Sequence, residues 1–539
     1  MSRPNPFVLI AVLLLFVAMF GGAPLLKGGL YLDANEGDSY HLLDILLQID
    51  MGLRPYVDFS TPLGFLTFLP ISSAMDAGYP IGTAILLAQL GVAIALFPFV
   101  VYVGLTRFGG SLAWMFGVLT LGLVLSLSFG GAFNGISVAM HYNRWAWALG
   151  FVAVALAILP SQHERPVLDG ALIGIFGAAL ALLKVTYFVA LAPGVFLALY
   201  MRWRGAGIVS AIFGGVAVAV AATAFQGFGF WSAYARDLLL VMGTEVRPFA
   251  GANLATIIAG SAFFGATMFG MAAFLMIRRS GHDVAAYALL LLIPGFIYVT
   301  YQNFGNDPQW VWFLGLVIFA LRPECGVGKI AGYDLRLLMG GAAWVALALN
   351  FPSLFSNVTS PLSHAQMDAA RFQPMIPSAL GHQDIFVRND RGNAMTALLH
   401  QDRESAAWAR YAPIVDRAPL SEFGGVPFPY CEWASGSRAY LERVAEELVQ
   451  DGLTAESQIL FADSLAGLWL FGPFKPLSGG APWYYGGLTG LENADYLVIP
   501  KCAFVTGLRA IMIDELQSSE IGFSLVRDGE IYALFKVTP

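Results

Sequence analysis

Acidic side chains are concentrated in one stretch near the start of the chain. Residues 31–64 read YLDANEGDSYHLLDILLQIDMGLRPYVDFSTPLG and contain one basic residue, Arg54. The acidic residues of this stretch are Asp33, Glu36, Asp38, Asp44, Asp50 and Asp58. A carboxylate can remove a proton from a hydroxyl group as a general base, and oxygen ligands suit a hard cation. A solvated loop is the alternative interpretation, because ionised carboxylates are stable in water.

Two features of this stretch favour a functional site over a solvated loop. Glu36 and Asp38 precede the segment SYHLLDILLQIDMG, whose apolar residues recur with helical spacing. This pattern predicts an amphipathic helix that is suited to a membrane surface. The next segment, RPYVDFSTPLG, is restricted by its prolines to an extended conformation. It returns Asp58 towards the region of the first acids.

The composition around this stretch is that of a membrane protein. Of the 539 residues, 57% are hydrophobic and 12% are charged, whereas about a quarter of the residues are charged in a soluble domain. A membrane-spanning helix needs about 20 mostly apolar residues, and the chain has many such runs. We therefore predict an α-helical polytopic membrane protein. No basic tract indicates binding to nucleic acid.

About eleven membrane-spanning helices are predicted from the apolar runs. The runs are 7–23, 81–105, 111–129, 145–160, 167–183, 185–200, 206–226, 254–277, 284–302, 309–321 and 332–350. Loops on the cytoplasmic side carry an excess of Lys and Arg. This rule puts the N-terminus in the cytoplasm, and the first outer loop, 28–80, on the opposite side. The predicted transmembrane domain is 1–350, and the chain after it also lies outside the cytoplasm.

A soluble α/β domain is predicted for residues 355–539. The segment SRAYLERVAEELVQDG has helical periodicity, and QILFAD and ADYLVIPK are typical of buried strands. IGFSLVRDGEIYALFKV predicts a hairpin that turns at Asp528 and Gly529. Cys431 and Cys502 both fall in this domain, where an oxidising compartment would allow a disulfide. Either the two cysteines form a bridge or they are two separate buried thiols.

The acidic loop resembles the first exported loop of one class of membrane enzymes. The segments NEGDSY and GLRPYVDFSTPLG are similar to a loop pattern of the GT-C superfamily of glycosyltransferases. That superfamily includes the protein O-mannosyltransferases and the bacterial aminoarabinose transferase. HYNRWAW, LKVTYF and NFGNDPQW also resemble segments of bacterial members. Asn35 stands where many members have Asp, so Glu36, Asp38 and Asp33 are alternatives for the essential acid.

The resemblance implies sugar transfer from a polyprenyl-phosphate donor at the outer face of the membrane. The acceptor would be a glycan, lipid or protein of the envelope, and its hydroxyl group would attack the anomeric carbon while the lipid phosphate leaves. Glu36, Asp38 or Asp33 would be the catalytic base. Asp58 would orient the acceptor. The resemblance fixes no cofactor, but Glu36, Asp38 and Asp58 would be the ligands if a divalent cation such as Mg²⁺ or Mn²⁺ takes part.

Polar and basic residues on the predicted outer face are candidates for substrate binding. They are Asp58, Arg54, Tyr56, Arg144, Asn143, Lys184, Asn306 and Asp307. Arg144 could bind phosphate through its planar fork of donors, and Lys184 lies in a very short outer hairpin between two spans. The alternative for both cations is snorkelling at the membrane interface. For Asn306 and Asp307 the alternative is an ordinary turn.

Two other functions compete with the transferase. A transporter or flippase would place charges or broken helices near the middle of the bilayer, and the predicted spans carry almost none there. A non-catalytic protein of envelope polysaccharide assembly would use the exported domain instead. The predicted location is the bacterial inner membrane, with a cytoplasmic N-terminus and a periplasmic C-terminal domain.

Overall fold

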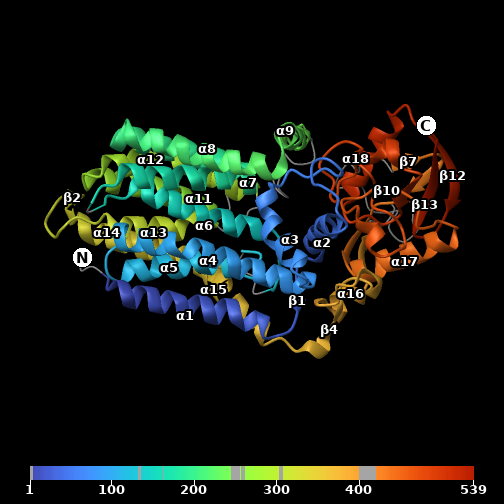
Figure 1. The fold of residues 1–539 in the computed structure, drawn as a ribbon, viewed down its shortest axis with the longest axis horizontal. Helices are drawn as coiled ribbons and strands as arrows, with labels where there is room; N and C mark the ends of the chain where they lie inside the picture. The colour runs from blue at the N-terminus through green and yellow to red at the C-terminus, as the bar shows by residue number, and fades with distance from the viewer. Residues whose placement is uncertain are drawn as a thin grey trace, which may run out of the picture. The chain divides into compact units, whose positions relative to one another are not determined.

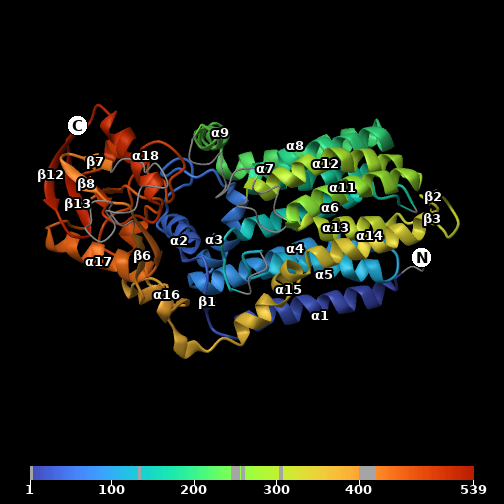
Figure 2. The same cartoon turned by 180° about the vertical axis from the view of Figure 1, so that it is seen from behind.

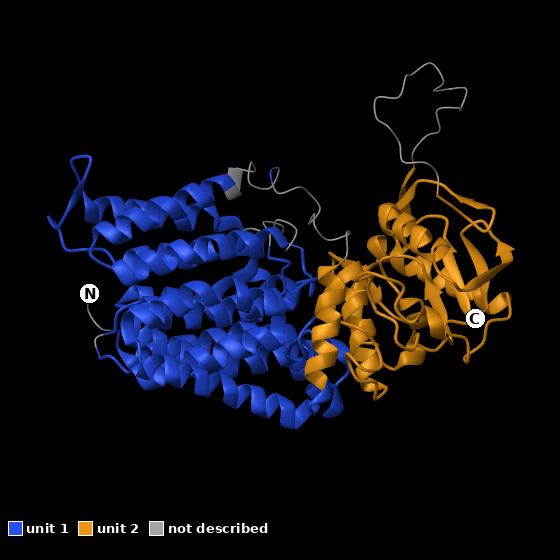
Figure 3. Cartoon of the chain, turned by 90° about the horizontal axis from the view of Figure 1, so that it is seen from above, with its two compact units in different colours: residues 1–30, 63–229, 248–367 blue, residues 31–62, 230–247, 368–539 orange. Residues whose placement is uncertain are grey.

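The computed structural model describes residues 4–130, 135–161, 163–243, 255, 261–302, 308–399 and 421–538. The chain divides into two compact units, shown in blue and orange in Figure 3. Unit 1 consists of residues 1–30, 63–229 and 248–367, and unit 2 of residues 31–62, 230–247 and 368–539. The acidic stretch therefore groups with the C-terminal region, although the sequence placed it with the transmembrane domain. The segment 230–247 joins the same unit.

Unit 1 is built almost entirely of helices that lie side by side (Figures 1 and 2). Its helices are α1 (Pro6–Leu25), η1 (Phe65–Thr67), α3 (Leu69–Asp76), α4 (Ile81–Arg107), α5 (Ser111–Leu125), α6 (His141–Ile158), α7 (Pro166–Trp203), α8 (Ala206–Gln226), α11 (Ser261–Arg279), α12 (Asp283–Gln302), α13 (Trp310–Ala320), α14 (Leu335–Leu349) and α15 (Phe351–Ala365). A short hairpin, β2 (Lys329–Ile330) and β3 (Tyr333–Asp334), precedes α14. The helical fold follows from the apolar sequence, because a helix satisfies its own backbone groups within lipid.

Several of these helices are suited to cross a membrane. Within the described ranges, five are long and apolar enough, namely α1, α4, α7, α8 and α12. The count rises to six if α14 and α15, which meet at a 57° bend, form one broken span. The helices α5 and α13 are apolar but shorter. The structure therefore supports a membrane protein and does not confirm the eleven predicted spans.

The helix α7 folds back on itself at Lys184. Lys184 has non-helical backbone angles, φ −154° and ψ 102°. Glu164 precedes the helix, and its two carboxylate oxygens accept hydrogen bonds from Arg202 and Trp203 at the other end, at 2.6 and 2.7 Å. A straight helix of 38 residues would separate these ends by about 57 Å. The predicted hairpin at Lys184 between two apolar segments is therefore confirmed.

Unit 2 combines small sheets with short helices. Its strands are β1 (Leu30–Leu32), β4 (Phe372–Pro374), β5 (Ile385–Arg388), β6 (Thr396–Leu399), β7 (Ser421–Phe423), β8 (Val426–Phe428), β9 (Cys431–Ser435), β10 (Ile459–Phe461), β11 (Tyr496–Pro500), β12 (Gly522–Asp528) and β13 (Tyr532–Thr538). Its α-helices are α2 (Glu36–Asp50), α9 (Gly229–Met242), α16 (Asn389–Asn393), α17 (Ser437–Gln450) and α18 (Thr506–Gln517). Short 3₁₀ helices are η2 (Ala369–Arg371), η3 (Ser378–Leu380), η4 (Gly467–Leu470) and η5 (Leu491–Asn493).

The largest sheet of unit 2 has the strand order β10-β11-β13-β12. β10 and β11 are parallel, and the other neighbours are antiparallel. The predicted buried strands correspond to β10 and β11, the predicted hairpin to β12 and β13, and the predicted helix to α17, so these four predictions are confirmed. Leu497, Ile499 and Phe535 of the sheet pack against Met512 and Ile513 of α18 in the core.

Cys431 and Cys502 form a disulfide in unit 2, with their Cα atoms 4.5 Å apart. Backbone hydrogen bonds bring the two residues together. Ala503 N–H donates to the Cys431 carbonyl, and Trp433 N–H donates to the Ala503 carbonyl, both at 2.9 Å. Of the two alternatives that the sequence left open, the structure has the bridge.

Replacing Cys431 and Cys502 with serine should destabilise unit 2. Loss of the cross-link should lower the free energy of unfolding by about 2–5 kcal/mol, because the denatured chain regains freedom. Thermal unfolding of the full chain in detergent measures the change. Cys325, which is exposed and unbridged, provides the control variant Cys325→Ser, which should leave unfolding unchanged. Equal stability of both variants would contradict a structural role for the bridge.

Candidate functional site

Glu36 begins α2 and is held in an ion pair by Arg391 of α16. Arg391 Nη2 donates to Glu36 Oε2 at 2.8 Å, and Arg391 Nε donates to Glu36 Oε1. The Glu36 side chain is only 9% exposed. Both of its oxygens are therefore engaged by the planar fork of one guanidinium group. This arrangement positions the first turn of α2 and makes Glu36 an anchor of the site.

Asp33 and Asp38 lie on either side of this anchor and are half-buried. The pKa values of Arg388 and Arg391 are raised, chiefly by their bonds to Asp390 and Glu36 and further by the charge of Asp33. Asp33 thus belongs to the same charged cluster as Glu36. Asp38 is in the first turn of α2, where the helix dipole favours a negative charge.

Asp58 closes the turn that Arg54 begins. Asp58 Oδ2 accepts a hydrogen bond from Arg54 N–H at 2.7 Å and lies 3.5 Å from Arg54 Nε. The Asp58 carbonyl accepts from Gly479 N–H at 2.9 Å, and Ser60 N–H donates to the Gly480 carbonyl at 2.8 Å. Asp58 and Arg54, which the sequence assigned to substrate binding, therefore stabilise one turn. Backbone hydrogen bonds attach this turn to the C-terminal region.

Tyr56 has a left-handed backbone conformation, φ 70°, and its ring is buried. The ring packs edge-on against Phe230 and Tyr234 of α9, at centroid distances of 5.3 and 5.2 Å. Arg236 Nη2 donates to the Tyr56 carbonyl at 2.7 Å. Tyr56 therefore packs the acidic stretch, to which it belongs, against α9.

Asp237 of α9 is a buried acid that the sequence analysis missed. Its Oδ2 accepts a hydrogen bond from Thr61 N–H at 2.8 Å. Burial raises the Asp237 pKa to about 6, although the Thr61 bond and the charge of Arg236 lower it in part. Asp237 and Arg391 lie far from the acidic stretch in sequence, so no local spacing pointed to them.

The candidate metal ligands are not assembled into a metal centre. Across the described ranges, no group of three or more His, Cys, Asp or Glu side chains is placed to hold a metal ion. Glu36 is engaged by Arg391 and Asp58 by its own turn. The acids of unit 2 are thus organised by ion pairs and backbone donors.

Asn143, Arg144 and Lys184 meet within unit 1. Lys184 Nζ donates to Asn143 Oδ1 at 2.8 Å and lies 5.1 Å from the centre of the Tyr142 ring. Arg144 is 1% exposed, and its Nη1 donates to the Ala139 carbonyl at 3.0 Å. The first turn of α6 and the break in α7 therefore bring Lys184 to Asn143, the neighbour of Arg144 in sequence.

Two donors of this cluster have no acceptor among the described residues. They are Arg144 Nη2 and Asn143 Nδ2, and both are buried. A guanidinium group keeps its proton in proteins, and a buried charge is costly unless it is paired. The cluster is therefore suited to an anion that brings acceptor oxygens to the N-terminal end of α6.

The segment Gly64–Thr67 fixes the break in α7. Gly64 N–H and Thr67 Oγ1 both donate to the Leu183 carbonyl, each at 3.1 Å. The His141 ring nitrogen lies 3.3 Å from the Thr67 carbonyl. A Cβ atom on Gly64 would lie 1.9 Å from the Leu182 carbonyl oxygen, so only glycine allows this approach. Asn306 and Asp307 lie outside the described residues.

Comparison with known proteins does not assign the chain to a family. No protein-family model matches the chain, and no curated protein is significantly similar to it.

Replacing Arg391 with alanine should destabilise unit 2, because the carboxylate of Glu36 would stay buried without its partner. The expected loss in the free energy of unfolding is about 1–3 kcal/mol. The control is Arg388→Ala, because the Arg388–Asp390 pair is exposed and such a pair contributes about 0–1 kcal/mol. Denaturant unfolding followed by circular dichroism measures both variants. Equal losses would show that the Arg391 pair has no special role.

Proposed function

We propose that the chain is a membrane glycosyltransferase that moves a sugar from a polyprenyl-phosphate donor to an envelope glycan, lipid or protein. The observation that carries the proposal is the pair of buried donors, Asn143 Nδ2 and Arg144 Nη2, beside the ammonium group of Lys184. A phosphate group has the oxygens and the negative charge that these donors lack. In this proposal the cluster binds the donor phosphate and stabilises it as the leaving group.

The acidic stretch would supply the base. Asp33, Asp38 and Glu36 are the candidates for proton removal, and of these Glu36 has both oxygens engaged by Arg391. Glu36 would position the first turn of α2, in which Asp38 lies. The base removes the proton of the acceptor hydroxyl group. At the same time the hydroxyl oxygen bonds to the anomeric carbon of the sugar, and the bond between that carbon and the phosphate oxygen breaks.

The positions of charges in the apolar helices favour a transferase over a transporter. Asp169 and Arg202 lie in the end turns of α7, Lys184 lies at its break, and Arg107 ends α4. The helices α1 and α8 contain no charged residue. A transporter would place its polar residues within the spans.

The disulfide supports an exported location for unit 2 in this proposal. Bridges such as Cys431–Cys502 persist in the periplasm and are rare in the cytoplasm. The chain would therefore lie in the bacterial inner membrane, with its N-terminus in the cytoplasm and unit 2 in the periplasm.

Removal of the base should abolish sugar transfer. We expect Asp33→Asn or Asp38→Asn to lower the rate by about 10²–10⁴-fold, and Glu36→Gln to have a smaller effect. Transfer is measured in membranes that contain polyprenyl-phosphate sugars, by mass spectrometry of the consumed donor. Asp50→Asn, at the exposed end of α2, is the control. Full activity of all three acid variants would favour a non-catalytic role in envelope assembly.

Replacing Arg144 with glutamine should weaken donor binding. Loss of a charged hydrogen bond of about 1.5–3 kcal/mol predicts a rise in KM for the donor of roughly 10–100-fold. Arg144→Lys should recover part of this loss, because it restores the charge without the fork of donors. The exposed Arg204 gives the control variant Arg204→Gln. An unchanged KM for Arg144→Gln would contradict a phosphate site at α6.

A further inference from the structure

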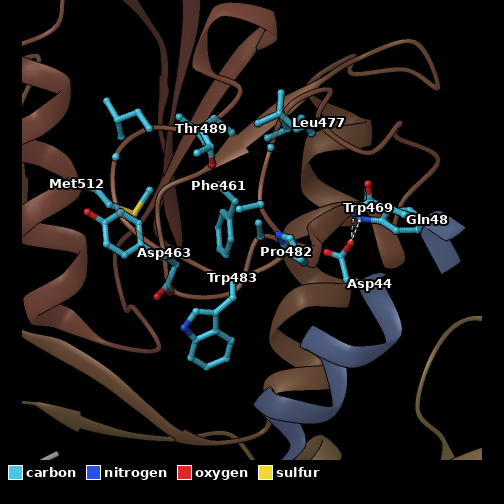
Figure 4. Close-up of a pocket in the computed structure, with 18 residues that line it drawn as sticks. Asp44, Gln48, Phe461, Asp463, Trp469, Leu477, Pro482, Trp483, Thr489 and Met512 are labelled. Carbon is cyan, nitrogen blue, oxygen red and sulfur yellow. Dashed lines mark hydrogen bonds between the residues drawn. The ribbon is translucent and has the colours of Figure 1, made fainter. Parts of the chain in front are cut away.

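Unit 2 contains a small pocket between α2, the strand β10 and the long segment that follows β10. Its volume is about 40 Å³, and Figure 4 shows the side chains that line it. Its polar and aromatic lining includes Asp44, Gln48, Asp463, Trp469 and Trp483. One water-sized probe occupies about 10–15 Å³. The pocket therefore admits a small terminal group of a ligand and not a whole sugar ring.

The pocket has more buried acceptors than its own donors satisfy. Asp44 is 1% exposed and Gln48 is 4% exposed. Asp44 Oδ1 accepts hydrogen bonds from Gln48 Nε2 at 2.6 Å and from Trp469 Nε1 at 3.1 Å (Figure 4). Gln48 Oε1 is buried and has no partner in the described part of the chain. Neither of these two bonds uses Asp44 Oδ2, and Gln48 Oε1 is the buried acceptor that needs a donor from a ligand.

Asp463 contributes a second carboxylate to the same pocket. It follows β10, and its oxygens accept the N–H groups of Ser464 at 2.6 Å, Phe504 at 2.7 Å and Val505 at 3.4 Å. These donors fix Asp463 at the start of α18. It lies at the carboxyl end of a parallel strand pair, where open α/β sheets commonly bind ligands.

No cation is among the residues that line the pocket, although the charge of Arg509 acts on Asp463. The residues that line it include two carboxylates and no Lys, Arg or His. Burial raises the pKa of Asp44 to about 7, although the bonds from Gln48 and Trp469 lower it in part. Burial also raises the pKa of Asp463 to about 7, against the lowering effect of its backbone bonds and of Arg509.

We propose that this pocket binds the primary ammonium group of a small ligand, such as an amino sugar or an amino alcohol. An ammonium group has three donors and no acceptor, which matches Asp44 Oδ2 and the unpartnered Gln48 Oε1. It also supplies a positive charge to Asp44, which has no cation beside it among the residues that line the pocket. A hydroxyl group has one donor and two lone pairs, and it would bring further acceptors without any charge.

The aromatic walls fit the same ligand. Trp469 and Trp483 line the pocket on two sides (Figure 4). The face of an indole ring attracts a cation within about 6 Å. Trp483 is half-buried and also packs near His41 of α2, at a centroid distance of 5.5 Å. This ligand site does not depend on the proposed sugar transfer.

Ligand affinity should rise with pH between about 5 and 8. The pKa of Asp44 and of Asp463 is raised to about 7, so both groups are largely protonated at pH 5 and become ionised as the pH passes through 7. Other titratable groups near the two carboxylates are His41, which lies one helical turn before Asp44 and contacts Tyr485, and Tyr484, which donates a hydrogen bond to Glu515. Tyr440 and Arg509 interact electrostatically with Asp463. A ligand that is neutral across this range should show no such rise.

The test uses the full chain in detergent and ligand-detected NMR titration. Ethanolamine is compared with ethylene glycol, and glucosamine with glucose, at pH 5 and pH 8. We expect the two amines to bind at least tenfold more tightly than their neutral counterparts at pH 8. Asp44→Asn should weaken amine binding at least tenfold while it keeps the acceptor for Gln48 and Trp469. Asp50→Asn on the same helix is the matched control.

Three results would overturn the proposal. The first is the absence of binding by both amines at pH 8. The second is equal binding of glucose and glucosamine, which would indicate a site for hydroxyl groups. The third is an equal loss in Asp44→Asn and Asp50→Asn, or no loss in either, with unchanged thermal unfolding of both variants.

Discussion

The carbonyl group of Leu183 has to find hydrogen-bond donors where α7 breaks, and this constraint organises the polar end of unit 1. A backbone break among apolar helices is stable only if other groups satisfy it. Gly64 N–H and Thr67 Oγ1 do so, which fixes the segment after the acidic stretch against the turn of α7. Lys184 follows the break directly and can therefore reach Asn143 in α6. The anion site that we propose exists only because the break holds these residues together.

Unit 2 depends on a different constraint, because three separate segments of the chain build it. Two of them, 31–62 and 230–247, lie in the sequence between apolar helices of unit 1. Directed contacts attach the first of them to the C-terminal region, among them the Glu36–Arg391 pair and the Asp44–Trp469 bond. Such contacts cost desolvation and contribute specificity of position. They set the start and the middle of α2, and with them the places of Asp38 and of the small pocket.

The two proposed sites have opposite polarity. The cluster at α6 has two buried donors without acceptors, and the pocket at α2 has one buried acceptor without a donor among the described residues. Buried polar groups in native proteins are normally satisfied, so both surpluses point to ligands. One site fits a phosphate group and the other an ammonium group.

The sequence by itself determined the helical membrane character, the strands β10 to β13, the helix α17 and the turn at Lys184. Each of these follows from local periodicity or from a single polar residue in an apolar run. It also directed attention to Asn143, Arg144 and Lys184, because charges near the ends of apolar helices are few. It predicted eleven spans, of which the described residues support five or six by length and composition.

Only the tertiary structure decided which acids are engaged and which partners they have. Arg391, Trp469 and Asp237 lie between 176 and 425 positions from the residues that they contact, and no local pattern links positions at such distances. The same holds for the bridge between Cys431 and Cys502, which depends on the pairing of β9 with the chain after β11. Spacing in sequence predicts elements, whereas the charge balance of a site depends on which elements pack together.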